Sequence, residues 1–227
     1  MASYWFTILS SLLVAGGLAV WVGRAVDDAR LRAAAWMGIV AQLAWTAAVG
    51  ATGIVSDFSR VPPPLALFFL GLFLVVGLAT LSPLGRRLAD ATPLRFLIGM
   101  QAFRVLPELL LHLAWKDGLA PIRLTVHGRN VDIVTVLVAA ALALAWPRLR
   151  SRRAWAWGFT ALGLALLANV VVTAVLSLPT PFQVFVNERP NVFVTTFPYV
   201  WLPGFLVFTA LLLHAVTLRR LVRGHVD

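Results

Sequence analysis

The sequence predicts an all-α protein, a polytopic membrane bundle of seven transmembrane helices that forms one domain over residues 1–227. Hydrophobic residues make up 60% of the chain, whereas soluble globular proteins contain about 45–50% apolar residues. The mean hydropathy is +0.89. The apolar residues come in runs of about 20, the length of a helix that crosses a bilayer. No polar stretch is long enough for a separate soluble domain.

Seven apolar runs alternate with charged or proline-containing breaks. The charges of the first run follow it rather than precede it, so we expect a retained helix and not a cleaved signal peptide. Arginines and prolines separate later runs, as in "SPLGRRLADATP" and "SLPTPFQVFVNERPN", and helices end at such breaks. The expected spans are residues 4–22, 33–54, 64–82, 94–115, 131–147, 154–176 and 194–217.

The basic residues set the expected orientation. Thirteen of the 19 Lys and Arg residues lie in the first, third and fifth loops and the C-terminal tail, five lie in the other loops, and one lies within a span. Cytoplasmic loops carry the excess of positive charge, so we expect the N-terminus outside and the C-terminus in the cytoplasm. The expected place is the cell (inner) membrane. The net charge of +10 is then explained by the basic cytoplasmic loops and does not indicate a protein that binds nucleic acid.

The two longer outer loops, residues 116–130 and 177–193, are expected to roof the outer end of the bundle. In the second loop, "FQVFVNERPNVFV" alternates apolar and polar residues around a turn-like "NERPN". The pattern fits a short outer hairpin or lid, and it fits an irregular loop equally well.

The fourth span carries three ionisable residues, Arg104, Glu108 and His112. Spacings of four place them on one helical face, in a ladder from mid-membrane to the outer surface. A charge at the bilayer centre costs about 2.5–3.5 kcal/mol, so such groups face protein or water. Two interpretations stay open. Arg104 and Glu108 pair with each other and pin the helix to its neighbours, or this face lines a polar pocket.

The other intramembrane polar groups also favour the outer half. Pro107 and Pro203 are expected to bend their helices there, because proline removes a backbone donor. We therefore expect an outward-facing polar cavity between the fourth, fifth, sixth and seventh spans. Besides Arg104, Glu108 and His112, its candidate ligand-binding residues are Arg129, Asn130, Asp132, Asn169, Tyr199 and Trp201.

Several classes of site are excluded or left open. Cysteine is absent, which excludes disulfides and cysteine metal sites. Lys116, the one lysine, lies in a loop, which excludes a retinal Schiff base within the seventh span. His112 and His127 could hold zinc or iron together with Glu108 or Asp132, so a metal stays open, and no other cofactor is expected. His214 is expected near the cytoplasmic surface.

Three segments, "FRVLPELLL", "GRNVDIVT" and "PYVWLPGFL", resemble a group of uncharacterised bacterial multi-pass membrane proteins. The resemblance covers about a tenth of the chain. It implies a compact helical bundle and names no activity. The positions that it carries over are Arg104, Glu108, Arg129, Asn130, Asp132, Trp201 and Pro203.

The leading hypothesis is a non-enzymatic membrane protein that binds or passes a small polar or anionic solute from the outer side. Arg104 is expected to supply positive charge, and Glu108 and Asp132 to orient the ligand or carry protons. Two other classes stay open. One is an intramembrane enzyme, metal-dependent or not. The other is an accessory subunit of a membrane complex whose polar face meets a partner helix or a second copy of the chain.

Overall fold

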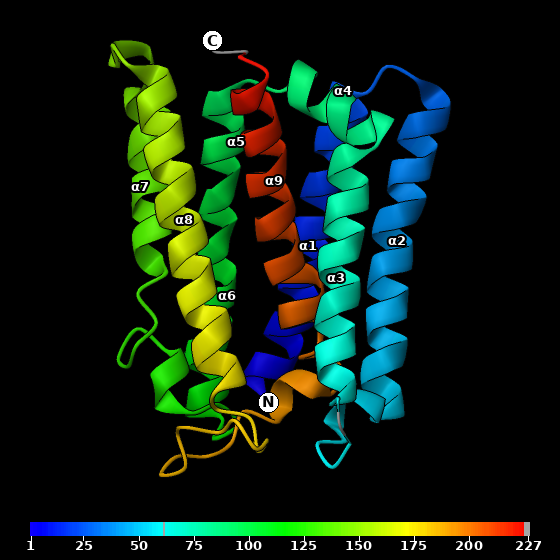
Figure 1. Ribbon diagram of the computed structural model, residues 1–227, viewed down its shortest axis with the longest axis vertical. Coiled ribbons are helices and arrows are strands. Elements are labelled where there is room, and N and C mark those ends of the chain that lie inside the picture. The colour runs from blue at the N-terminus through cyan, green and yellow to red at the C-terminus, as the bar shows by residue number, and fades with distance from the viewer. Residues whose placement is uncertain (61, 225–227) are drawn as a thin grey trace.

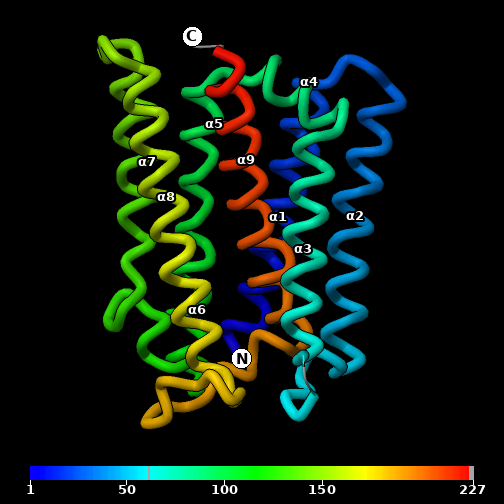
Figure 2. Tube along the Cα trace, in the orientation of Figure 1, coloured from blue at the N-terminus to red at the C-terminus, as the bar shows by residue number. Residues whose placement is uncertain are grey.

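The protein is a bundle of long helices that run side by side (Figures 1 and 2). The computed structural model describes residues 1–60 and 62–224, and these residues form helices, turns and loops but no strand. The chain begins at one end of the bundle and the last helix ends at the other (Figure 1). The predicted all-α class is confirmed.

Six helical segments in the described part of the chain are long and apolar enough to cross a membrane. This makes the chain a multi-pass membrane protein, as predicted. The six segments are α1 (Ala2–Ala25), α2 (Ala29–Thr52), α3 (Pro64–Leu81), the α5–α6 segment (Leu94–Lys116), α8 (Arg152–Val175) and the last segment, Leu202–Val222.

Local sequence explains where several helices begin and end. The Asp28 carboxylate accepts hydrogen bonds from the backbone N–H groups of Arg30 and Leu31 at the start of α2, which satisfies donors that lack a helical partner. The same helix ends at Gly53, whose φ of 69° lies in the left-handed region that favours glycine. Pro64 opens α3, where no N–H is needed.

The apolar run expected at 131–147 forms a shorter helix. This helix, α7 (Ile133–Ala145), has 13 residues and therefore rises about 20 Å, and a 3₁₀ turn extends it to Arg148. Figure 1 shows α7 beginning part-way along its neighbour α8. The connection before α7 must therefore run into the bundle to reach the helix.

The break at 82–93, expected to be a loop, contains a further short helix, α4 (Pro83–Ala91). The Ser82 hydroxyl caps it by accepting a hydrogen bond from the Gly85 N–H. Its two faces differ, because Leu88 is buried whereas Arg86 is exposed. It lies at the end of the bundle where the last helix ends (Figure 1).

The last helix begins later than expected. Residues 193–201 form a 3₁₀ turn and tight turns, and the helical segment opens as a π-helix, Leu202–Val207, that continues as α9 (Phe208–Val222). Pro203 lies in this irregular part and cannot donate a backbone hydrogen bond. The segment 182–194 forms no hairpin, and its described residues follow an irregular loop with a short 3₁₀ turn.

The central element of the bundle is α9, which contacts α3, α4, α5 and α8. Most of its residues from Phe208 to Leu221 are buried. Arginines in its last turns donate to carbonyls at the ends of other helices. Arg220 bonds the Ala89 carbonyl at 2.7 Å and Arg219 bonds the Ser82 carbonyl at 3.1 Å. These contacts hold the ends of α3 and α4 to α9.

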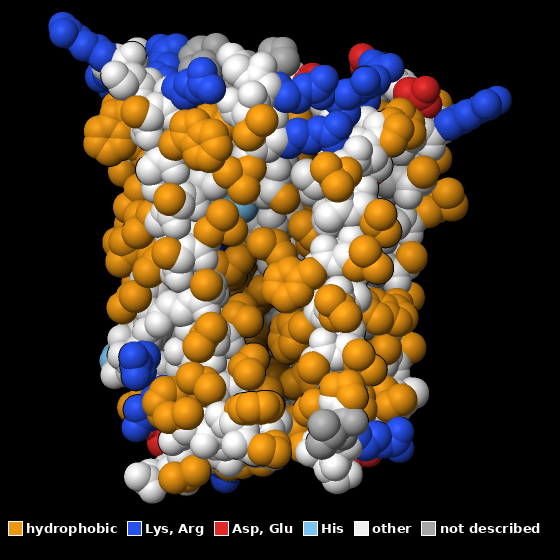
Figure 3. Space-filling model, in the orientation of Figure 1, with side chains coloured by type: hydrophobic (Ala, Val, Ile, Leu, Met, Phe, Trp, Pro, Cys, Tyr) orange, Lys and Arg blue, Asp and Glu red, His pale blue; other side chains and the backbone are white. Residues whose placement is uncertain are grey.

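Charge and hydrophobicity separate along the long axis of the molecule (Figure 3). Lys and Arg side chains gather at the two ends, most of them at the end that holds α4, and an apolar band lies between. Large side chains such as Leu13, Phe73 and Leu137 are more than half exposed in this band. Such a surface suits contact with lipid rather than water.

We predict that Gly50 on α2 tolerates no larger residue. A Cβ atom there would lie 2.5 Å from Val200 Cγ1 and 3.1 Å from the Phe197 backbone nitrogen. Gly50→Ala should therefore lower stability by about 1–3 kcal/mol, measured as a lower melting temperature in detergent. Gly38→Ala on the same helix is the control, because a Cβ there meets nothing within 4 Å and alanine favours a helix. Equal melting temperatures for the two variants would contradict the close packing.

Candidate functional site

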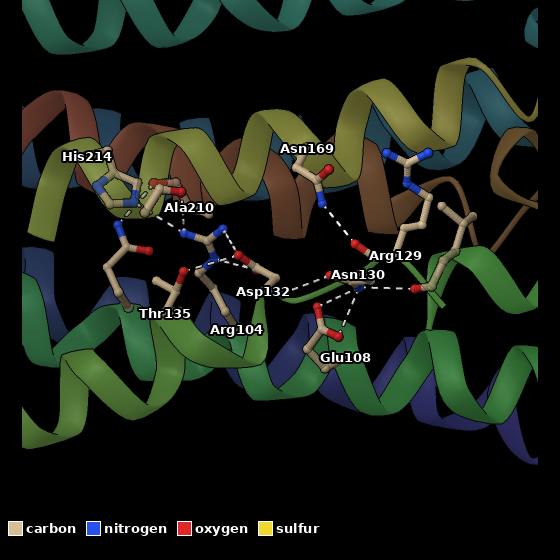
Figure 4. Close-up of polar contacts among 12 residues, drawn as sticks. Arg104, Glu108, Arg129, Asn130, Asp132, Thr135, Asn169, Ala210 and His214 are labelled. Carbon is tan, nitrogen blue, oxygen red and sulfur yellow. Dashed lines mark hydrogen bonds and ion pairs between the residues drawn. The ribbon is translucent and has the colours of Figure 1, made fainter. Parts of the chain in front are cut away.

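The Arg104 guanidinium lies at the centre of a buried polar network (Figure 4). Its Nε donates to Asp132 Oδ2 at 2.8 Å, and its Nη2 donates to Asp132 Oδ1. Its Nη1 donates to the Gly163 carbonyl at 3.1 Å and lies 3.2 Å from His214 Nε2. All three guanidinium nitrogens are therefore engaged by the protein itself.

A break in the fourth span positions Arg104. Between α5 (Leu94–Met100) and α6 (Val105–Lys116), residues Gln101–Arg104 form a 3₁₀ turn. Pro107 follows in the first turn of α6 and cannot donate to the Phe103 carbonyl. The pair of Arg104 with Glu108, one of the two open interpretations, does not form as a direct ion pair, because Asp132, just before α7, pairs with the guanidinium instead.

The segment before α7 brings Asn130 and Asp132 into the interior, where they are 2% and 4% exposed. Both are among the candidate ligand-binding residues that the sequence indicates. Asn130 Oδ1 accepts the Asp132 backbone N–H at 3.0 Å, which turns the Asn130 amide nitrogen toward Glu108. The nitrogen donates to Glu108 Oε1 and Oε2 at 2.8 and 2.9 Å and to the Leu124 carbonyl at 3.0 Å.

Glu108 differs from Asp132 because it has no cationic partner. It is 5% exposed, and within the described residues no Lys, Arg or His side chain forms an ion pair with it. Its two oxygens share the donors of one neutral amide. The carboxylate therefore keeps unused acceptor capacity.

A narrow cavity of about 60 Å³ reaches this network from between α3, α8 and the last helical segment. Apolar side chains form most of its wall, and its polar lining residues are Arg104, Glu108, Asp132 and Asn191. Asn191 is fully buried. Its Nδ2 donates to the Ala174 carbonyl at 3.1 Å, but its Oδ1 has no hydrogen-bond partner.

The structure separates His112 from the central network. Its ring lies 5.5 Å from the His127 ring and 5.6 Å from the Trp115 ring, measured between centroids. In the described residues no group of three or more His, Asp or Glu side chains comes together to hold a metal ion. His112 and His127, which the metal-site hypothesis requires, thus lie close together. No third ligand joins them among the described residues.

Arg129 and Asn169 lie at the periphery of the network. Asn169 Nδ2 donates to the Arg129 carbonyl at 3.0 Å (Figure 4), whereas the Arg129 guanidinium lies over the Phe185 ring at 5.8 Å. Arg123 Nε donates to Glu188 Oε1 at 2.5 Å. The two longer loops therefore contact each other across this end of the bundle.

Tyr199 and Trp201 face another part of the bundle. The Tyr199 hydroxyl lies 2.9 Å from Ser3 Oγ, and Trp201 Nε1 donates to the Leu43 carbonyl at 3.0 Å. They tie the start of the last helical segment to α1 and α2. The Ser3 hydroxyl also donates to Asp117, beyond the end of α6, and with the Met1 amino group and the Ser3 N–H it lowers the pKa of Asp117 to about 2.

Sequence reasoning missed His214, Gln101, Thr135 and Asn191. His214 was expected near the cytoplasmic surface, but it is 1% exposed and contacts Arg104. The contact depends on Gly163, since a Cβ there would lie 2.6 Å from His214 Cε1. A glycine within an apolar helix is a weak signal of such an approach, and the sequence does not show which helix faces it.

Removing the Asp132 carboxylate is predicted to be strongly destabilising. Asp132→Asn leaves Arg104 as an uncompensated buried charge, which costs about 3–5 kcal/mol. The melting temperature in detergent measures this loss. Asp57→Asn is the control, because the Asp57–Arg60 pair, 2.8 Å apart, lies in a surface loop and such pairs contribute about 1 kcal/mol or less.

The double variant Arg104→Met with Asp132→Leu should regain much of the stability that Asp132→Asn loses, because hydrophobic residues can replace a complete buried pair. If Asp132→Asn is as mild as Asp57→Asn, the Arg104–Asp132 pair does not hold the bundle together.

The comparisons with known proteins place the chain in a family. The sequence profile of a domain of unknown function, DUF8737, matches residues 62–222, which include α3 to α9 and the whole central network. Comparison with curated proteins and with solved structures finds no match. The chain belongs to the DUF8737 family of domains of unknown function.

Proposed function

We propose that this protein binds, or passes across the membrane, a small molecule whose polar group donates hydrogen bonds to Glu108 and Asn191. Arg104 and Asp132 balance each other in charge, which leaves Glu108 as the remaining acid that lines the cavity. An ammonium group is the donor that best complements this acid. A hydroxyl or amide donor meets the same acceptors without a charge.

The observation that carries the proposal is the imbalance between acceptors and donors in the cavity. Glu108 retains unused acceptor capacity and Asn191 Oδ1 is buried without a partner. Every nitrogen of Arg104 is already bonded. An anionic solute, which the sequence alone allowed, would have to displace Asp132 from the guanidinium. A donor-bearing ligand needs no such exchange.

The proposal includes a topology. We infer that α7 is the seventh membrane segment, because its apolar residues pack against α5 and α8 within the bundle. An odd number of spans fits a chain that begins at one end of the bundle and whose last helix ends at the other (Figure 1). The excess of arginines at the α4 end supports an N-terminus outside and a C-terminus in the cytoplasm. The narrow cavity then belongs to the outer half of the membrane.

Single cysteines can test this topology, because the chain has none of its own. Asn187 and Ser151 are exposed in loops at opposite ends of the bundle. Asn187→Cys should react with a membrane-impermeant maleimide on intact cells, and Ser151→Cys should react after permeabilisation alone. The reverse pattern would place the N-terminus in the cytoplasm.

Ligand chemistry can be tested with two small probes of opposite charge, ethylammonium and acetate. We expect ligand-observed NMR on the purified protein to detect binding of ethylammonium in preference to acetate. Glu108→Gln should weaken ethylammonium binding about tenfold or more, because a hydrogen bond to a charged partner is lost. Asp57→Asn removes an acid outside the cavity and should leave binding unchanged. Preferential acetate binding, or binding unaffected by Glu108→Gln, would refute the proposal.

A further inference from the structure

We infer that the ligand is an amphiphile that reaches Glu108 from the bilayer, through a lateral groove between α3 and α8. Its polar donor group would occupy the narrow cavity, and its apolar tail would lie in the groove. The inference rests on the proposed function, because it takes the Glu108 end as the head-group site. It adds the class of molecule and its route.

The groove is large enough for a hydrocarbon tail. Its volume is about 320 Å³, within the usual range of about 300–1,000 Å³ for ligand pockets. Every residue that lines it is apolar, with Leu72 and Val76 from α3, Leu164 and Val171 from α8, and Leu211 from α9 among them. Figure 3 shows this hollow in the middle of the molecule, with hydrophobic side chains on its walls and floor.

The groove and the narrow cavity adjoin each other. Five residues line both spaces: Phe69, Leu167, Val171, Pro203 and Val207. The groove opens on the side of the bundle, where Phe73 and Val172 are exposed, and the adjoining cavity is lined by the buried residues Glu108, Asp132 and Asn191. A single molecule can therefore place an apolar part in one and a polar part in the other.

The position of the groove indicates where its occupant comes from. Its walls lie at the middle of α3 and in the second half of α8, and Phe73 and Val172 are 54% and 53% exposed. In the proposed topology this depth is the hydrocarbon region of the bilayer. The tails of membrane amphiphiles meet the groove there, whereas a water-soluble solute would have to cross hydrocarbon first.

The irregular start of the last helical segment lines both the groove and the narrow cavity. Both α3 and α8 pack on α9, and Pro203 and Val207 of the π-helical turn lie between them. A π-turn is uncommon and frequently marks a functional site. Gln42 Nε2 donates to the Gly204 carbonyl at 2.8 Å and so supports this turn from α2.

The charge of Glu108 distinguishes the occupant from ordinary phospholipid. Phospholipid head groups carry an anionic phosphate and lie at the membrane surface, whereas Glu108 lies buried within the bundle. A phosphate beside this carboxylate would be repelled. An alkylamine, or another slender amphiphile with a hydrogen-bond donor as its head group, fits both the groove and the cavity.

A photo-crosslinking experiment tests the inference. The protein in lipid nanodiscs is exposed to dodecylamine that carries a diazirine in mid-chain, and in parallel to the matched probe with a methyl ether in place of the amine. We expect crosslinks on the lining of the groove, about fivefold more frequent with the amine, because the amine gains a charged hydrogen bond. Equal labelling by the two probes, or labelling spread over all lipid-facing helices, would overturn the inference.

Two variants block the groove without touching the head-group site. Ala168→Trp and Leu164→Trp, which line the groove and not the narrow cavity, should each reduce groove labelling by the amine about fivefold or more, because the indole fills the space of the tail. Leu137→Trp is the matched control, since Leu137 is 63% exposed outside the groove. Size-exclusion profiles show whether each variant folds. If neither Trp variant folds, the comparison of the two probes on the unaltered protein still shows whether the amine head group directs labelling to the groove.

The two proposals fail in different ways. If ethylammonium binds and depends on Glu108, but dodecylamine does not label the groove, the lateral route is wrong and the proposed function stands. If neither probe binds in a manner that depends on Glu108, the proposed function is wrong and the inference fails with it.

Discussion

Arg104 is 1% exposed in the middle of a bundle that faces lipid, and the rest of the structure depends on how this guanidinium is satisfied. A bilayer supplies no water at that depth, so the protein must provide an anion and the remaining acceptors. The segment before α7 provides Asp132, because α7 begins deep in the bundle. α8 provides the Gly163 carbonyl, and because residue 163 is glycine, α8 approaches α9 closely enough for His214 to reach the same cation.

The neutralisation of Arg104 sets the chemical character of the cavity. A free arginine there would favour anions, but the paired one leaves Glu108 as the acid that no cation balances. Asn130 links Glu108 to the Asp132 backbone, because its side-chain oxygen accepts from the Asp132 N–H while its amide nitrogen donates to the Glu108 carboxylate. The position of Glu108 is thus coupled to the segment that enters the bundle before α7. The unused acceptor of Asn191 adds to the same surplus of acceptors among the described residues that line the cavity.

The apolar groove follows from the same architecture. α9 is the element on which the others pack, and α3 and α8 contact it from different sides, which leaves a hollow between them. Side chains of the π-helical turn with Pro203 line the inner part of the hollow. The acidic lining of the cavity and the apolar groove therefore result from different elements that meet at one helix. Tyr199 and Trp201 stabilise the beginning of this segment against α1 and α2.

The sequence by itself determined the all-α membrane bundle, the place of its long helices and the importance of Arg104, Glu108, Asn130 and Asp132, because apolar run length and the cost of buried charge are local properties. Only the tertiary structure decided that Arg104 pairs with Asp132, that His214 reaches the network, that Asn191 lines the cavity, and that His112, Tyr199 and Trp201 lie apart from the network. Helical spacing gives the face of one helix, but partners depend on where other helices begin and how closely they approach. The short α7, the late start of the last helix and the contact at Gly163 are such properties.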